Sequence, residues 1–150
     1  MKRITLLLLV SILCGCALGP GPDEQPPENW SPEKKVSYYI RKLPDQSYVT
    51  YYGDEGDVDL SDRVTWHTAA EQLGQVGMPA IPTLMGRLDS TDPHERSLVL
   101  YALLLASQDD DLRKATKGDY IKVYAWDPKA HDKNADIARE WWSRWQHLWD

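Results

Sequence analysis

Cysteine is scarce in this chain of 150 residues: its two copies, Cys14 and Cys16, stand one residue apart. A disulfide between them would close a strained ring, and two sulfurs without a third cysteine make half a zinc site at best. Long apolar runs are missing near the N-terminus as well, because the run at residues 4–13 has about ten residues where a bilayer-spanning helix needs about 20. These absences argue against a disulfide scaffold, a cysteine-based zinc site and a permanent transmembrane helix.

Catalytic signatures are also absent. The sequence has no Gly-x-Ser-x-Gly motif, no phosphate-binding loop and no pair of carboxylates in an acid–base signature. Four histidines are present, but their spacing matches no zinc motif: His67, His94, His131 and His147. The sequence therefore predicts a protein that is not an enzyme and that needs no cofactor.

The acidic loop "GDEGDVDLSD" at residues 53–62 invites comparison with a calcium site. Asp57, Asp59 and Ser61 alternate as the first ligands of an EF-hand loop do. Asp62 stands where that loop needs glycine, and Thr68 stands where it needs a bidentate glutamate. We therefore predict no metal site here.

The N-terminus has the layout of a secretory signal peptide: Lys2 and Arg3, then the apolar run, then the small residues Gly15 and Ala17. Within it, "LCGC" at residues 13–16 resembles the bacterial lipobox, which directs lipid attachment to a cysteine. The resemblance implies a signal peptide over residues 1–15 and lipidation of Cys16. Cys14 is a mild departure, since Ala, Ser or Thr is usual at its position.

The resemblance also implies a location. A lipidated Cys16 would anchor the chain stably to a membrane through several acyl chains. In lipoproteins of two-membrane bacteria, Asp directly after the cysteine retains the protein at the inner membrane, and this chain has Ala17 there. We therefore predict a lipoprotein of the cell envelope, anchored at the outer membrane and facing the periplasm.

A tether is predicted over residues 16–30. Residues 17–29 hold four prolines, two glycines and three acids, and a Pro-rich stretch of this length reaches roughly 40 Å at about 3.1 Å per residue. Loss of Lys2 and Arg3 with the signal peptide leaves 15 basic against 23 acidic residues, a formal charge of −8. This charge argues against nucleic acid and anionic lipid headgroups as partners.

Residues 31–150 are predicted to form one all-α domain. Ser31 and Pro32 start a helix whose apolar face carries Val36, Tyr39, Ile40 and Leu43. The next stretch holds at most a short extended piece and a loop, not a sheet. Three further helices follow, with these inward positions: Trp66, Ala69, Ala70 and Leu73 after the caps Ser61 and Asp62; Ile81, Leu84, Met85 and Leu88 after a turn at Gly74 and Gly77; and a helix capped by Thr91 or Asp92 with Pro93 and Glu95 in its first turn.

An internal echo with a period of 33 residues points to a repeat. It superposes Arg63, Trp66, Ala69, Ala70 and Leu73 on Arg96, Val99, Ala102, Leu103 and Ala106. Residues 69–106 resemble a HEAT-like repeat in these positions: Leu73, Gly77, Ala80, Ile81, Leu84, Leu88, Asp89, Arg96, Ala102 and Leu103. The C-terminal part resembles the closing segment of some bacterial HEAT-like proteins through Trp126, Asp127, Pro128, Trp141 and Trp142. The resemblance implies a short antiparallel helical stack that binds a protein or another ligand.

Two aromatic groups are candidates for partner binding. The last helix, about residues 134–149, carries Trp141, Trp145 and Trp149 as a stripe that is mainly core, which leaves Trp142 and Trp149 as candidates for an exposed docking surface. Tyr51 and Tyr52 are candidates in the N-terminal loop. The first hypothesis is a scaffold that binds another envelope protein, and the alternative is a glycan- or peptidoglycan-binding module that uses exposed Trp and Tyr.

Overall fold

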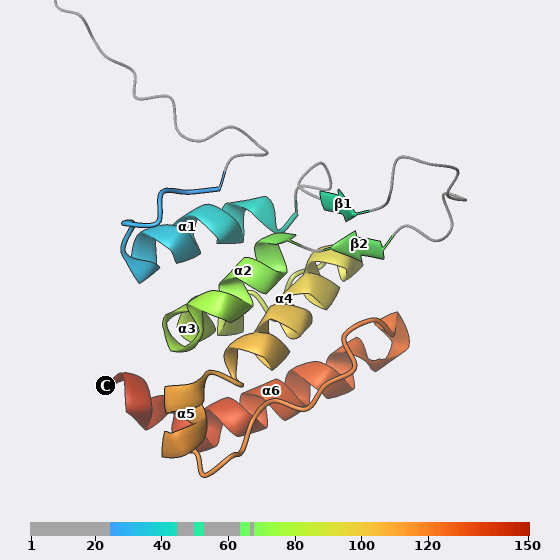
Figure 1. Cartoon of the computed structure of the whole chain (residues 1–150). Helices are drawn as coiled ribbons and strands as arrows, with labels where there is room; N and C mark the ends of the chain where they lie inside the picture. Colours follow the sequence, from blue (N-terminus) through green and yellow to red (C-terminus); the bar gives the residue numbers. More distant parts are fainter. Residues whose placement is uncertain (1–24, 45–49, 53–63, 67) are drawn as a thin grey trace, which may run out of the picture.

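The computed structural model describes residues 25–44, 50–52, 64–66 and 68–150, and this part of the chain is helical apart from one pair of three-residue strands (Figure 1). The predicted all-α class is confirmed to that extent. The elements are α1 Pro32–Lys42, β1 Thr50–Tyr52, β2 Val64–Trp66, α2 Thr68–Val76, the 3-10 turn η2 Met78–Ala80, α3 Ile81–Met85, α4 Pro93–Ala106, α5 Asp110–Ala115, η3 Pro128–Ala130, α6 His131–Trp145 and η4 Gln146–Trp149. None of the helices in these ranges is long and apolar enough to cross a membrane.

The helix starts follow the capping signals in the sequence. Ser31 caps α1 by accepting a hydrogen bond from the Lys34 amide at 3.4 Å, and Pro32 occupies the first turn. Asp92, and not Thr91, caps α4 by accepting from the His94 amide at 2.9 Å. Both cap predictions are confirmed, because a side-chain oxygen at this position satisfies an amide that the helix itself leaves without a partner.

The strand pair corrects the prediction that this stretch holds a short extended piece and a loop but no sheet. Tyr51 of β1 pairs with Thr65 of β2 in an antiparallel register. Trp66 therefore ends a strand and is not part of the following helix, which begins at Thr68. Val64, Thr65 and Trp66 are β-branched or aromatic, and such residues favour extended backbone. The expected caps Ser61 and Asp62, and the acidic loop at residues 53–62, lie outside the described residues.

The two glycines expected at one turn have different roles. Gly77 turns the chain with a φ of 72°, a conformation that glycine adopts without strain. Gly74 lies inside α2, where an added Cβ would sit 2.5 Å from the Cβ of Leu105. Its missing side chain is what lets α2 and α4 approach closely, so the prediction of a turn at Gly74 is wrong.

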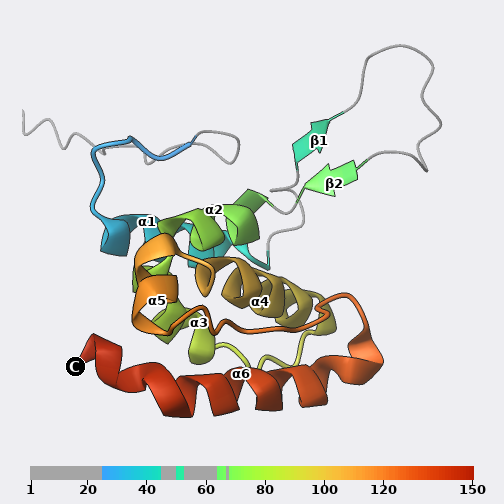
Figure 2. The same ribbon diagram turned by 60° about the horizontal axis from the view of Figure 1, so that its bottom comes forward.

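The helices form three layers. α1 and α2 lie side by side in the first layer, α3 and α4 form the second, and α6 runs along the far side of that layer (Figures 1 and 2). The predicted inward positions of α1 to α4 fill the core between the layers, except that Met85 is half-buried. The largest completely buried side chains include Leu73, Ile81, Leu84, Leu100, Leu103 and Trp141.

Residues 25–30, at the end of the predicted tether, pack against the α1 layer. Pro26 is buried, and the side-chain oxygen of Gln25 accepts a hydrogen bond from the Tyr39 hydroxyl at 2.7 Å. Trp30 packs edge-on against Tyr38, with ring centroids 5.9 Å apart. The folded unit therefore includes residues 25–30, which precede the Ser31 cap.

The C-terminal helix ends earlier than predicted. α6 stops at Trp145, and the chain tightens into η4. This tightening brings the indole Nε1 of Trp149 to the Met78 carbonyl of η2, to which it donates at 3.0 Å. Trp149 therefore no longer continues the straight stripe through Trp141 and Trp145.

Candidate binding surface

The predicted site residues do not form one surface. Tyr51 and Tyr52 lie on β1 at one end of the molecule, whereas Trp142 and Trp149 lie near the C-terminus at the other end (Figures 1 and 2). Cys16 lies outside the described residues. A partner that used the tyrosine pair and the tryptophan pair together would have to span the whole length of the helical stack.

The C-terminal tryptophans form a partly buried cluster. Trp142 and Trp149 are both half-buried against the core, with ring centroids 4.9 Å apart. Trp149 also packs edge-on against the buried Trp141, at 6.3 Å. The cluster holds the C-terminus onto η2 and leaves only part of each of the two outer rings open to a partner.

The most exposed aromatic side chains among the described residues lie elsewhere. Tyr124 is 68% exposed and Trp126 is 41% exposed, and both belong to the segment between α5 and η3, which is neither helix nor strand. We call residues 119–127 the aromatic strap. In the strap Ile121 and Ala125 point inward, whereas Lys122, Tyr124 and Trp126 are exposed. This two-residue alternation is visible in "YIKVYAW", and it was the signal from which the exposed pair could have been predicted.

Three buried polar side chains hold the strap in place. The Ile121 amide donates to Oγ of Ser107 at 3.0 Å, and Nδ2 of Asn134 donates to the Tyr124 carbonyl at 2.7 Å. Nε2 of His131 lies 3.2 Å from the Ala125 carbonyl. Since Ser107, Asn134 and His131 come from the end of α4 and the start of α6, the packing of these helices sets the position of the exposed rings.

We expect Ser107→Ala to loosen the strap locally. The substitution leaves the buried Ile121 amide without its acceptor, which costs about 1–3 kcal/mol. Hydrogen exchange should show faster exchange of the Ile121 amide. Thermal unfolding should show a lower melting temperature. Ser143→Ala is the matched control, because Ser143 is exposed and donates only to the Glu140 carbonyl of its own helix. Equal exchange rates in the two variants would contradict this account of the strap.

Trp126 is supported from beneath by α4. Its ring lies 5.2 Å from that of Tyr101, and the Tyr101 hydroxyl donates to the Glu71 carboxylate of α2 at 3.4 Å. Burial raises the pKa of Glu71, and the hydrogen bond from Tyr101 opposes this shift. Further along the strap, Nζ of Lys122 lies 5.0 Å from the centre of the Tyr120 ring. The strap thus presents exposed aromatic rings, with a cation beside the Tyr120 ring.

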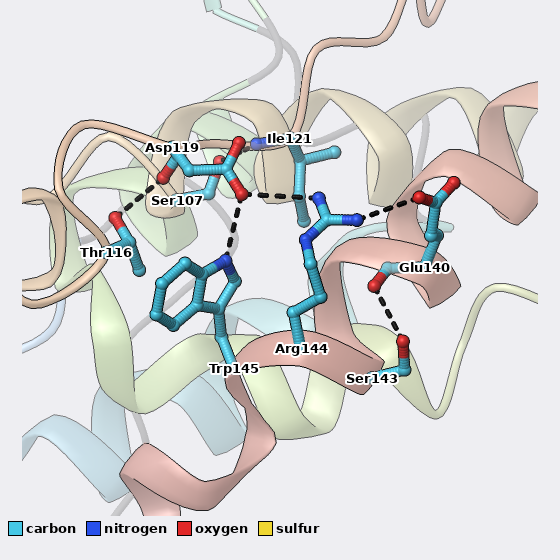
Figure 3. A network of polar contacts seen from close by, with 8 residues as sticks. All are labelled: Ser107, Thr116, Asp119, Ile121, Glu140, Ser143, Arg144 and Trp145. Atoms are coloured by element: carbon cyan, nitrogen blue, oxygen red, sulfur yellow. Dashed lines mark hydrogen bonds and ion pairs between the residues drawn. The ribbon is translucent and has the colours of Figure 1, made fainter.

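A polar network fastens the start of the strap to α6 (Figure 3). The Asp119 carboxylate accepts from the Trp145 indole at 2.9 Å and pairs with Arg144 at 3.2 Å, and the Arg144 guanidinium also pairs with Glu140 at 2.9 Å. Thr116, which is buried, donates its hydroxyl proton to the Asp119 carbonyl at 2.7 Å. Burial raises the pKa of Asp119, but the hydrogen bonds from Trp145 and Arg144 outweigh burial and leave that pKa below its usual value.

This pKa shift predicts an acid-dependent loss of stability. The pKa of Asp119 is lower in the folded chain than in the unfolded chain, where it is about 3.9. Its contribution is therefore complete above about pH 4 and is lost as the pH falls through the folded-state pKa. Asp119→Asn should melt at a lower temperature than wild type at pH 7, and the difference should shrink as the pH approaches about 2. A difference that stays constant over this range would contradict the role of the carboxylate.

A charged groove of about 550 Å³ lies between the starts of α4 and α6. Its two arginines already have acidic partners: Arg96 pairs with Asp132 at 2.8 Å, and Arg139 pairs with both Asp89 and Asp136, at 2.6 and 2.8 Å. These pairs tie α6 to the loop before α4. An anion that entered the groove would have to displace these aspartates, so the groove is better suited to holding the helices together than to binding an anionic ligand.

Ser97 and His131, which adjoin the groove, do not form a nucleophile and its base. Their side chains approach to 3.0 Å between Oγ and Nε2, and both residues are buried. The Ser97 hydroxyl, however, donates to the Pro93 carbonyl at 3.1 Å, so its proton is already engaged. Since Nε2 also faces the Ala125 carbonyl, which only accepts, Nε2 must carry a proton. A nitrogen that donates in this way cannot activate a serine hydroxyl.

Comparison with known proteins does not assign the chain to a family. No protein-family model, no curated protein and no solved structure matches it. Within the described ranges, no group of three or more His, Cys, Asp or Glu side chains is placed to hold a metal ion. The function is therefore inferred from the chain's own residues.

Proposed function

We propose that the protein is a lipid-anchored lipoprotein of the bacterial cell envelope whose helical domain binds another envelope protein through the aromatic strap. The observation that carries the binding role is the exposure of Tyr124 and Trp126 on a segment held by buried polar contacts. Rigid aromatic side chains give large contact areas at low entropic cost and are enriched in protein interfaces. The proposed role is binding and not catalysis.

The anchor rests on the sequence alone. Leu13, Gly15 and Cys16 occupy the positions that the lipobox requires, after two basic residues and a short apolar run. Lipid on Cys16 and the absence of Asp at position 17 support placement at the outer membrane, facing the periplasm.

We also propose that α1 to α4 form a short HEAT-like stack of two helix pairs. The 33-residue echo supports this arrangement, because equivalent positions are buried in both copies: Ala69 with Ala102, Ala70 with Leu103, and Leu73 with Ala106. α2 and α4 pack against each other, and these residues belong to one buried core. α6 would then act as the cap that covers the open end of the stack, as terminal elements of solenoids do.

Site-specific photocrosslinking in cells tests the binding role. A photoreactive amino acid at position 124 should capture one specific protein, and the same probe at exposed Ser37 of α1 should not. Capture should survive muramidase digestion, should fall at least tenfold in Trp126→Ala, and should be lost in Cys16→Ser together with the membrane fraction. Capture that is unchanged by Trp126→Ala would contradict the strap as the binding surface, and membrane fractionation that is unchanged in Cys16→Ser would contradict the anchor.

The alternative is a glycan-binding module, and the exposed Trp126 ring with Tyr124 beside it is the observation that favours it, since sugar rings stack on aromatic faces. In that case insoluble peptidoglycan should pull down the wild-type protein but not Tyr124→Ala/Trp126→Ala. Soluble fragments should also quench tryptophan fluorescence in a Trp126-dependent manner. If peptidoglycan binds both proteins equally, this alternative fails.

A further inference from the structure

The position of the tether limits how the domain can sit on its membrane. Cys16 is followed by only nine residue steps before Gln25, which is hydrogen-bonded to Tyr39 in the α1 layer. At about 3.1 Å per residue these steps span about 28 Å. The reach is shorter than the roughly 40 Å expected from the whole Pro-rich stretch, because residues 25–30 pack against α1.

The stack itself is about as thick as the tether is long. Three helix layers, with about 8–10 Å between axes and a helix diameter of about 10–12 Å, give a thickness of about 30 Å. Gln25 attaches on the side of α1, and α6 lies on the opposite side (Figures 1 and 2). A tether that leaves the α1 side would have to pass around the domain before α6 could lie flat on the membrane. That path covers the full thickness and part of the width of the domain, so it is longer than the reach of about 28 Å.

Charge distinguishes the two sides as well. α1 carries Lys34, Lys35, Arg41 and Lys42 against one acid, Glu33, although the chain as a whole is acidic. At 100° per residue the four basic positions fall within about 120° of the helix circumference, an arc that also holds the buried Tyr38, while the other buried positions of α1 lie outside it. α6 carries three acids and three bases and has no such excess. Salt screens the interaction between exposed charges beyond about 10 Å. The local charge of α1, and not the net charge of the chain, therefore decides what this face attracts.

An aromatic residue completes the α1 side. Trp30 is half-buried and packs against Tyr38 of α1. It lies between the tether and Lys34 in the sequence. Tryptophan beside basic residues is typical of surfaces that meet the polar headgroups of a bilayer. The tether exit, the basic residues and Trp30 therefore share one side of the domain.

We propose that the α1 side is a docking surface for the anionic headgroups of the membrane that holds the lipid anchor, and that docking turns the aromatic strap and α6 toward the aqueous compartment. This inference rests on the proposed lipidation of Cys16. It deepens the proposed function, because the partner of the strap must then reach the domain from the aqueous side and cannot be the anchoring bilayer.

Energy transfer to lipid acceptors tests this orientation. The full-length protein isolated from membranes carries a fluorophore on a cysteine introduced by Ser37→Cys on α1 or by Ser143→Cys on α6, two exposed serines that form a matched pair. Each labelled variant is placed in vesicles that contain about 30% phosphatidylglycerol and a lipid whose headgroup carries the energy acceptor. Transfer should be at least twofold more efficient from position 37 than from position 143. The difference should fall in 1 M salt, in vesicles without anionic lipid and in Lys34→Glu/Arg41→Glu.

Each result decides a separate part of the proposal. Equal transfer from the two positions, or stronger transfer from position 143, overturns the proposed orientation. The anchor is tested separately, and it stands if the protein floats with the vesicles. A difference that does not respond to salt, lipid charge or Lys34→Glu/Arg41→Glu overturns the electrostatic docking. Failure of the membrane-isolated protein to float with vesicles overturns the anchor and this inference with it.

A longer tether tests the role of tether length. Inserting about 16 Gly/Ser residues before Gln25 in Lys34→Glu/Arg41→Glu should make the transfer efficiencies from positions 37 and 143 equal, because neither charge nor tether length then constrains the domain.

Discussion

Trp141→Ala should lower the free energy of unfolding by about 3–5 kcal/mol, the usual cost of removing a large buried aromatic side chain. Trp141 is 1% exposed and is the largest of the completely buried side chains between α6 and the rest of the stack. Since domains of this size are stable by only about 5–15 kcal/mol, the loss is a large part of the total. Urea unfolding followed by circular dichroism measures it without depending on tryptophan emission.

Two further variants separate the causes of this loss. The indole Nε1 of Trp141 is buried and has no hydrogen-bond partner among the described residues. Trp141→Phe removes this unsatisfied donor while keeping most of the packing, so we expect it to cost less than about 2 kcal/mol. Trp142→Ala should also cost less than Trp141→Ala, because Trp142 is only half-buried. A loss below about 1 kcal/mol in Trp141→Ala would show that α6 does not depend on this side chain.

Gly74→Ala should destabilise the protein although alanine is the better helix former. In an exposed helix this exchange gains about 1 kcal/mol. Here the new Cβ would lie 2.5 Å from Cβ and 3.0 Å from Cδ1 of Leu105, so α2 and α4 would have to move apart. Forced repacking of this kind costs about 1–3 kcal/mol, and we expect a net decrease of several degrees in melting temperature.

Gly86→Ala is the matched control for Gly74→Ala. A Cβ at Gly86 would meet no atom closer than the Thr83 carbonyl oxygen at 3.5 Å, and its φ of −66° suits alanine. We therefore expect an unchanged or slightly higher melting temperature for Gly86→Ala. If Gly74→Ala were equally harmless, the close approach of α2 to α4 would not depend on the glycine.

The binding surface was harder to predict than the fold. The pattern of the tryptophan-rich helix predicts exposed rings at Trp142 and Trp149, but both rings are half-buried in the C-terminal cluster. The helical patterns indicate no role for Tyr124, and Trp126 enters only through the family resemblance, although these two are the large hydrophobic side chains that the described residues expose most. Whether either pair binds a partner is decided by the crosslinking experiment and not by exposure alone.

Local chemistry explains what the sequence determined by itself. The Ser31 and Asp92 caps, the proline that follows each of them, and the periodic apolar positions of α1 and α4 depend only on residues a few positions apart, so they are legible without a structure. The short lipobox-like stretch around Cys16 is likewise readable only from the sequence. Helix starts, the helical class and most core positions belong to this group.

The tertiary structure decided which surfaces are covered. Gly74 resembles a turn glycine until Leu105 of another helix is placed against it, and Trp149 resembles a continued stripe until its indole reaches the Met78 carbonyl. The strap keeps its place because Ser107, Asn134 and His131, which come from the helices on either side of it, satisfy three of its backbone groups. Burial depends on what packs from elsewhere in the chain. A local alternation can indicate an exposed face, as in the strap, but the side from which the tether leaves is settled only when the three layers are assembled.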